Sequence, residues 1–415
     1  PPDSSDATPD PLLRCIWLTG PMTNLSFGQV MPAIPGPSIM PQRVLEAMAR
    51  PLGDLYAGPI LDASDEVRDQ LPVVAGMTEG QAFIVTSNGH GAWQMATSNT
   101  LARGDKILVL ESGRFPAVWG RYTAVSEVEV ELLPADFRGP VDPAALQARL
   151  EADTDREIRA ILCAHVDTAS SVRNDIGALR AAMDAADHPA LLMVDCIASM
   201  GCDRFEMDAW GVDVAVAGCQ KGLMVPPGVS FVWANDKAMA AHQTADLRIG
   251  YLDWTRRQSG GAIYDFYAGT PPVAHLYGLR EALAIIEDEG GIEAVWSRHQ
   301  VLGDAVRAAV DTWSAPGHLE HNIIDPAARS NAVTTVVTGA TDAQALRDRC
   351  AQQAGLTLGL GIGDVPGFRI GHMGHLNPPM LLGTLGTIEA ALGAMQVPIG
   401  GSGVAAAAAT IADAI

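Results

Sequence analysis

Short apolar runs alternate with amphipathic stretches along most of the chain. Several of the runs are apolar at every position, which is typical of strands covered by helices on both faces of a mostly parallel sheet. Such a sheet binds ligands beyond the carboxyl ends of its strands, so the loops that follow the runs are the first places to search for chemistry. Seven strands are predicted, at 82–85, 106–110, 128–133, 159–164, 191–195, 212–217 and 229–233.

Helical periodicity appears on both sides of these strands. Ser38 is predicted to cap a helix through Val44 and Met48, and a second helix is predicted over 62–76. Later in the chain a helical pattern at 276–286 stops at Gly290-Gly291.

The second half of the chain predicts a separate, smaller unit. An amphipathic pattern at 295–310 is followed by strand-like runs at 331–338 and 367–371, and an alanine-rich helix is predicted over 404–415. We therefore expect an α/β protein in three parts. These are a flexible tail rich in Pro, Asp and Ser over 1–24, a large domain with an N-terminal arm over 25–290, and a small α+β domain over 291–415.

Composition excludes several classes of protein. The chain has 415 residues, of which 48% are apolar and 18% charged, so it can bury a large core. Its net charge of −21 opposes binding to nucleic acid or to an anionic membrane surface. No apolar run approaches the roughly 18 residues that span a bilayer, and the first residues lack the order of a signal peptide. We expect a soluble, cytoplasmic protein.

The six cysteines are dispersed along the sequence. They form no CxxC pair, and no His or Cys stands at zinc-ligand spacing. We therefore expect reduced thiols and no bound metal.

One lysine follows directly on a predicted strand, in Ala217-Gly218-Cys219-Gln220-Lys221-Gly222. Most lysines are solvated, but this one stands among small residues and prolines. Burial lowers the pKa of an amine, and a free amine is what Schiff-base chemistry with an aldehyde cofactor requires.

Two further motifs strengthen this hypothesis. The strand at 191–195 delivers Asp195 to its carboxyl end, where an aspartate beside a pyridine nitrogen would make the ring an electron sink, although a helix cap or turn is the ordinary interpretation. Ser87-Asn88-Gly89-His90-Gly91-Ala92 lies between a strand and a helix, so its free amides are suited to a phosphate, or form a simple turn. Together with Lys221 they favour pyridoxal phosphate.

The ordered set of motifs resembles the class V aminotransferases of fold type I. The resemblance extends from about residue 33 to 403 and is nearest to the serine–glyoxylate and alanine–glyoxylate branch, through 220–224 and 276–283. It implies a seven-stranded, mostly parallel sheet in the large domain, a small C-terminal domain, and pyridoxal 5′-phosphate as cofactor. The motifs that carry it are Pro35-Gly36-Pro37-Ser38, Asn88-Gly89-His90-Gly91-Ala92-Trp93, Asp195, Gly218-Cys219-Gln220-Lys221-Gly222 and Phe368-Arg369-Ile370-Gly371-His372.

The resemblance also assigns roles to residues. Lys221 becomes the lysine that forms the Schiff base and shuttles the proton, and Asp195 the partner of the pyridine nitrogen. Arg369 grips the substrate α-carboxylate through its planar fork of donors, assisted by the main-chain N–H of Gly36. The other cofactor contacts that it implies are Asn88, Gly89, His90 and Gln220 at the phosphate, Phe115 stacked on the ring, Ile197 on the opposite face and Thr168 at O3′.

The resemblance further implies a homodimer and a reaction. Tyr267 and Thr270 keep the spacing of a tyrosine and a threonine that reach the phosphate in the partner subunit. The implied reaction is a ping-pong transfer of the amino group of serine or alanine to glyoxylate, which gives glycine and a 2-oxo acid.

Departures from the branch leave the amino donor open. The segments 165–171 and 54–59 differ from its usual motifs, so an aspartate–glyoxylate or pyridoxamine–pyruvate aminotransferase is an alternative. Arg114 or Arg173 would then supply a second cation for a dicarboxylate.

Three other functions are disfavoured. A cysteine desulfurase needs a nucleophilic cysteine on a loop of the small domain, whereas Cys350 falls in a helical pattern. The glycines at 359–363 lack the surroundings of a nucleotide-binding motif and predict a turn. A catalytically silent binding protein would be expected to lack Lys221 or Asp195.

Overall fold

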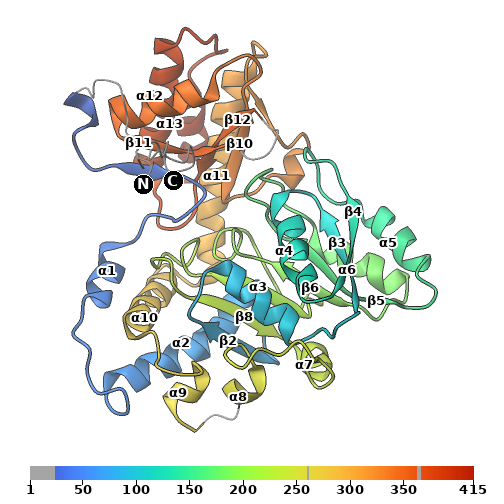
Figure 1. Cartoon of the computed structure of the whole chain (residues 1–415). Coiled ribbons are helices and arrows are strands. Elements are labelled where there is room, and N and C mark those ends of the chain that lie inside the picture. The colour runs from blue at the N-terminus through green and yellow to red at the C-terminus, as the bar shows by residue number, and fades with distance from the viewer. Residues whose placement is uncertain (1–23, 259–260, 362–365) are drawn as a thin grey trace, which may run out of the picture.

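The computed structural model describes residues 24–258, 261–361 and 366–415 (Figure 1). The predicted tail lies outside the described residues, except for residue 24, which begins the short 3-10 helix Asn24–Ser26. None of the helices in these three ranges combines the length and apolar character needed to span a bilayer.

The larger sheet has seven strands, as predicted. Its order is β2-β8-β7-β6-β5-β3-β4, and β8 alone runs antiparallel to its two neighbours. Every predicted strand lies within two residues of the observed bounds. The strands are β2 (Gln81–Val85), β3 (Lys106–Glu111), β4 (Glu129–Pro134), β5 (Ile158–Ala164), β6 (Leu191–Asp195), β7 (Val214–Gly218) and β8 (Ser230–Ala234).

Helices cover both faces of this sheet (Figure 1). Successive side chains of a strand point to opposite faces, so Leu192 and Val194 join one hydrophobic core while Leu191 and Met193 join the other. The sheet is therefore buried on both sides, which explains its continuously apolar strands. The accompanying helices are α1 (Gln42–Met48), α2 (Pro59–Ala75), α3 (Gly89–Ser98), α4 (Arg114–Ala124), α5 (Pro143–Glu151), α6 (Ile176–Ala185), α7 (Asp236–His242), α8 (Trp254–Gln258), α9 (Ile263–Phe266) and α10 (Val273–Asp288).

A second, five-stranded sheet has the order β1-β11-β12-β10-β9. Its strands are β1 (Met31–Ala33), β9 (Glu320–His321), β10 (Val333–Val337), β11 (Leu356–Leu360) and β12 (Gly367–Gly371). It packs with helices α11 (Ile292–Ser314), α12 (Ala343–Ala354), α13 (Pro378–Ala394) and α14 (Gly403–Ala412) around a core of its own. The N-terminal arm enters this sheet, because β1 pairs parallel with β11 (Figure 1). The domain limits stay a prediction.

Two local predictions are wrong. Ser38 does not cap α1, which begins after Pro41. The chain from Ser38 to Pro41 is instead extended along the loop of Lys221, and the Ser38 hydroxyl donates to the Lys221 carbonyl at 2.6 Å. The turn predicted over 359–363 fails at Gly359 and Leu360, which pair with β12 as the end of β11. Residues 362–363 lie outside the described residues.

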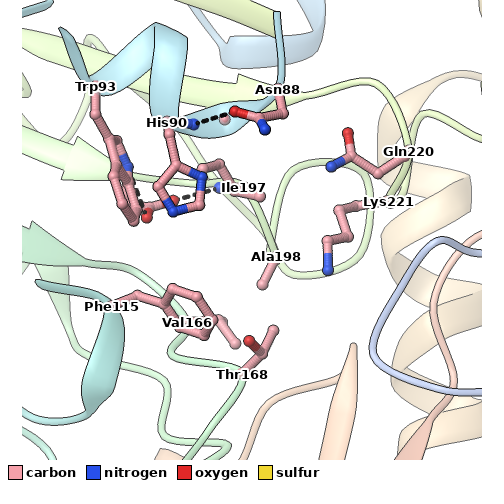
Figure 2. A pocket seen from close by; sticks show the side chains of 12 residues that line it. Asn88, His90, Trp93, Phe115, Val166, Thr168, Ile197, Ala198, Gln220 and Lys221 are labelled. Atoms are coloured by element: carbon pink, nitrogen blue, oxygen red, sulfur yellow. Dashed lines mark hydrogen bonds between the residues drawn. The ribbon is translucent and has the colours of Figure 1, made fainter. Parts of the chain in front are cut away.

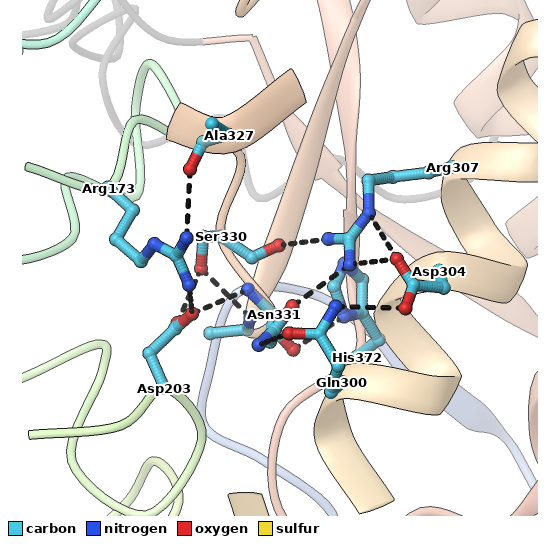
Figure 3. Close-up of polar contacts among 10 residues, drawn as sticks. Arg173, Asp203, Gln300, Asp304, Arg307, Ala327, Ser330, Asn331 and His372 are labelled. Carbon is cyan, nitrogen blue, oxygen red and sulfur yellow. Dashed lines mark hydrogen bonds and ion pairs between the residues drawn. The ribbon is translucent and has the colours of Figure 1, made fainter. Parts of the chain in front are cut away.

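A polar network joins the two sheets on one side (Figure 3). Asp203, in the loop after β6, accepts hydrogen bonds from the Ser330 hydroxyl at 2.8 Å and the Asn331 amide at 2.9 Å. Arg307 of α11 donates to Ser330 and Asn331 and is paired with Asp304. The network thus links the loop that follows Asp195 to the segment that enters β10, which in turn pairs with β12.

Candidate active site

A cavity of about 220 Å³ opens at the carboxyl ends of the central strands (Figure 2). Twelve residues line it, and nine of them were singled out from the sequence. The nine are Asn88, Gly89, His90, Phe115, Thr168, Asp195, Ile197, Gln220 and Lys221.

Three lining residues, Trp93, Val166 and Ala198, were given no role in the site from the sequence, although Trp93 stands in one of the quoted motifs. Trp93 carried a usable signal, because it lies one helical turn after Gly89 and so shares a face with it. Val166 and Ala198 are small apolar residues in loops, and no pattern marked them.

Lys221 stands in the loop after β7 and points its amine into the cavity (Figure 2). Its Nζ donates a hydrogen bond to the Pro35 carbonyl. Burial lowers the pKa of Lys221 to about 8, with a further contribution from the positive charge of Arg369. Near neutral pH a usable fraction of the amine is therefore unprotonated.

Gly36 makes room for this lysine. Its φ is +91°, and a Cβ at this position would lie 2.5 Å from both Cδ and Nζ of Lys221. Only glycine satisfies both conditions at low cost. Its main-chain N–H, assigned to the substrate by the resemblance, donates here to the Ile34 carbonyl at 2.7 Å.

Asp195 ends β6 and is buried. Its carboxylate accepts hydrogen bonds from the Ile197 amide at 2.7 Å and from Nε1 of Trp93 at 3.0 Å. Burial nevertheless raises the pKa of Asp195 to about 7, against the lowering effect of these two donors. An opposite charge inside the cavity would therefore favour the ionised form.

The amino end of α3 faces the same cavity. The side chain of Asn88 caps the helix by accepting from the His90 amide at 3.1 Å. Gly89 packs directly on Ile197, where a Cβ would overlap the isoleucine side chain. Gln220 adds a buried Oε1 that has no hydrogen-bond partner among the described residues. The amino end of α3 suits this end of the cavity to an anion, whereas the Gln220 Oε1 is an acceptor and needs a hydrogen-bond donor.

Asp167 connects the two segments that carry Phe115 and Thr168. Asp167 is fully buried, accepts from the Phe115 amide at 2.8 Å and also accepts from the amides of Ala169 and Ser170. These bonds fix the start of α4, and with it Phe115, against the loop that carries Thr168. The lining side chains of Phe115 and Thr168 therefore come from different segments that are both held by the carboxylate of Asp167.

Arg369 of β12 is buried behind Thr168 and does not itself line the cavity. Its Nη1 donates to the Thr168 carbonyl at 2.7 Å and its Nε to the Leu360 carbonyl at 2.5 Å. Burial lowers the pKa of Arg369 to about 10, so the group stays charged at neutral pH. Its Nη2 has no hydrogen-bond partner in the described part of the chain.

Four of the residues considered from the sequence lie away from this cavity. The hydroxyl of Tyr267 is buried and shares a hydrogen bond with Ser64 at 2.7 Å, while Thr270 is exposed. Arg114 is exposed at the start of α4, and Arg173 donates to the Ala327 carbonyl. Within one chain, none of the four lines the cavity.

Cys350 is buried in α12, outside the cavity, and burial raises the pKa of its thiol to about 12. A thiol in that state is a poor nucleophile. The structure thus gives no support to cysteine desulfuration.

The residues of the cavity fit pyridoxal phosphate. The amino end of α3 suits the phosphate, Asp195 suits a protonated ring nitrogen, and Lys221 suits the aldehyde. Phe115 and Ile197, on different elements, supply apolar surface for an aromatic ring.

Comparison with known proteins agrees with this fit. The sequence profile of the family Aminotransferase class-V matches residues 34–362. The serine–glyoxylate aminotransferase of Methylorubrum extorquens is 37% identical over 385 residues, covering 90% of this chain and 94% of that protein. The L-aspartate–glyoxylate aminotransferase of Paracoccus denitrificans is 37% identical over 379 residues, covering 90% and 94%.

A solved structure shares the fold. The crystal structure of ureidoglycine–glyoxylate aminotransferase from Bacillus subtilis matches with a TM-score of 0.83 at 22% identity, covering 94% of this chain and 100% of the other. The chain belongs to the class V aminotransferases, and it is a transaminase of fold type I that depends on pyridoxal phosphate.

Proposed function

We propose that the enzyme transfers the amino group of a small L-amino acid, serine or alanine, to glyoxylate in a ping-pong reaction that gives glycine and a 2-oxo acid. The observation that carries the proposal is the gathering of Lys221 and Asp195 in one cavity, with Arg369 directly behind its wall. The choice of glyoxylate rests on the relatives from Methylorubrum extorquens and Paracoccus denitrificans, because the name of each enzyme includes glyoxylate.

Bound pyridoxal phosphate supplies an aldehyde that takes up the amino group and a ring that accepts electrons. Asn88, Gly89, His90 and Gln220 would hold its phosphate, and Thr168 its O3′. Asp195 would keep the ring nitrogen protonated. These assignments follow from the lining of the cavity and from the family pattern.

Lys221 would move a proton at the substrate α-carbon. Its lowered pKa supports this role, because an amine that titrates near pH 8 can both accept and return a proton at neutral pH. Arg369 would bind the α-carboxylate of either substrate through Nη2, since Nε and Nη1 are held by carbonyl groups.

Aspartate is the second candidate donor. The relative from Paracoccus denitrificans, named for aspartate, matches this chain as well as the serine enzyme does. Against aspartate, neither Arg114 nor Arg173 lines the cavity within one chain. Arg369 does not line it either, but its Nη1 is hydrogen-bonded to the carbonyl of the lining residue Thr168. Pyridoxamine with pyruvate is the remaining alternative on this fold.

A homodimer with shared active sites is part of the proposal. Several large apolar side chains of the N-terminal arm are exposed, Leu25 at 84% and Phe27 at 74%, as is typical of a surface covered by a partner. By the family pattern Tyr267 and Thr270 would then reach the phosphate of the partner subunit, although in the single chain the Tyr267 hydroxyl is buried against Ser64 and Thr270 alone is exposed. Mixing the inactive variants Lys221→Ala and Tyr267→Phe tests this, because shared sites would restore activity in hybrid dimers.

The cytoplasmic location stays a prediction.

The donor is identified by a single-half-reaction screen. The holoenzyme is mixed with one amino acid at a time, and absorbance follows conversion of the pyridoxal form to the pyridoxamine form. We expect rapid conversion by serine or alanine and its reversal by glyoxylate. Rapid conversion by aspartate with serine and alanine inert would instead establish the second candidate.

A further inference from the structure

The helix at the proposed phosphate end of the cavity is also hydrogen-bonded to Asp195. Trp93 lies one turn into α3 and donates from Nε1 to Oδ2 of Asp195 at 3.0 Å, across 102 positions of sequence (Figure 2). The Ile197 amide occupies the other carboxylate oxygen at 2.7 Å. Each oxygen of Asp195 therefore has one donor from the protein.

The Trp93 indole is held in place on several sides. Trp119 is stacked on it with ring centroids 5.9 Å apart and planes 10° apart. His90 meets it edge-on at 4.5 Å, and Tyr122 does so at 6.3 Å. With only 1% of its surface exposed, the indole cannot turn its N–H away from Asp195 without moving these neighbours.

We propose that Trp93 is a positioning residue that keeps the Asp195 carboxylate ionised and aimed at the ring nitrogen of the cofactor. This inference rests on the proposed role of Asp195. It makes α3 a single rigid support for both ends of the cofactor, because Asn88 and Gly89 face the phosphate end and Trp93 orients the group at the nitrogen end.

The electrostatic surroundings show why a donor is needed. Asp195 faces the buried carboxyl of Asp167, which disfavours its ionised form, and the amine of Lys221, which favours it. The neighbouring thiols of Cys163 and Cys196 are buried, and burial raises their pKa values, so they remain neutral. Burial already brings the pKa of Asp195 to about 7, so the loss of one hydrogen bond would leave it mostly protonated at neutral pH.

The test compares two phenylalanine variants. Trp93→Phe keeps an aromatic ring but removes the donor, whereas Trp254→Phe removes a buried indole N–H that has no partner among the described residues, from a tryptophan that stacks on Phe83. Pyridoxamine 5′-phosphate is the probe, because it cannot react with Lys221. Its dissociation constant is measured by calorimetry between pH 6 and 10 on the full-length chain freed of cofactor. Titration of the probe itself is common to all variants and cancels in the comparison.

We expect Trp93→Phe to raise the pKa that governs binding by about one, because a hydrogen bond to a charged group changes that equilibrium about tenfold. Binding should then weaken about fivefold relative to wild type at pH 7 and recover by pH 9 to 10. Trp254→Phe should follow the wild-type profile. A Trp93→Phe profile parallel to that of Trp254→Phe at every pH would overturn the inference.

Asp195→Asn separates this inference from the proposed function. If it binds the probe as wild type does, the role of Asp195 fails, and that of Trp93 with it. If it weakens binding while Trp93→Phe does not, the inference about Trp93 fails alone. Should Trp93→Phe not fold, selective ¹⁵N labelling of the wild-type indoles decides the matter. The chemical shift of one indole N–H should change with pH around 7 in the wild type and should stop doing so in Asp195→Asn. If no indole resonance of the wild type titrates in this way, the proposed role of the hydrogen bond is refuted.

Discussion

Asp203 offers a quantitative test of how the two sheets are held together. Its carboxylate is buried and accepts from the Ser330 hydroxyl and the Asn331 amide, while Arg173 lies 3.7 Å away (Figure 3). Asp203→Ala would leave two buried donors without an acceptor, at about 1–3 kcal/mol each. Burial also disfavours the charged form of Asp203 and so raises its pKa. Removing this buried charge therefore offsets part of the cost of the two unpaired donors. We expect a net loss of about 2–4 kcal/mol in the free energy of unfolding.

The matched control is Asp304→Ala in the same network. Asp304 pairs with Arg307 at 2.6 Å, but its side chain is 46% exposed, so water replaces the lost contact at a cost of about 0–1 kcal/mol. Asp203→Asn, which keeps one acceptor, should fall between the two alanine variants. The assay is chemical denaturation followed by circular dichroism on all three variants and wild type. Equal destabilisation by Asp203→Ala and Asp304→Ala would refute the reasoning, because it would mean that burial of the carboxylate does not set the cost.

Three further outcomes are expected. Gly36→Ala should lower kcat at least tenfold, because the new Cβ overlaps Lys221 at a φ of +91°. Gly28→Ala, where a Cβ meets nothing within 4 Å, should leave kcat unchanged, and equal kcat values for the two variants would contradict the reasoning. Capture of pyridoxal phosphate by the cofactor-free chain should accelerate as pH rises through about 8, because the free amine of Lys221 reacts, and a midpoint above 10 would contradict the lowered pKa. Arg369→Lys should reduce kcat/KM about 10–100-fold in both half-reactions while leaving cofactor affinity unchanged, and a loss in only one half-reaction would remove Arg369 from its shared role.

The sequence by itself determined the large sheet and the chemistry beside it. Strands buried on both faces must be apolar at every position, as Leu191–Asp195 is up to its last residue. Such runs can therefore be recognised as strands from the sequence, without knowledge of the strands that pair with them. Asp195 and Lys221 follow the adjacent parallel strands β6 and β7, and the carboxyl ends of parallel strands meet at one edge. Their proximity could therefore be predicted from chain order and strand direction alone.

Tertiary structure alone decided which distant groups complete the site. The three residues of β1 are too few to show a period, and their place beside β11 depends on a partner more than 300 positions away. The carbonyl of Pro35 on Lys221, the indole of Trp93 on Asp195 and the carbonyl of Thr168 on Arg369 join groups 186, 102 and 201 positions apart. Periodicity records whether a side chain is buried but carries no information about which buried group it meets, because that choice is made by the packing of one sheet and its helices against the other.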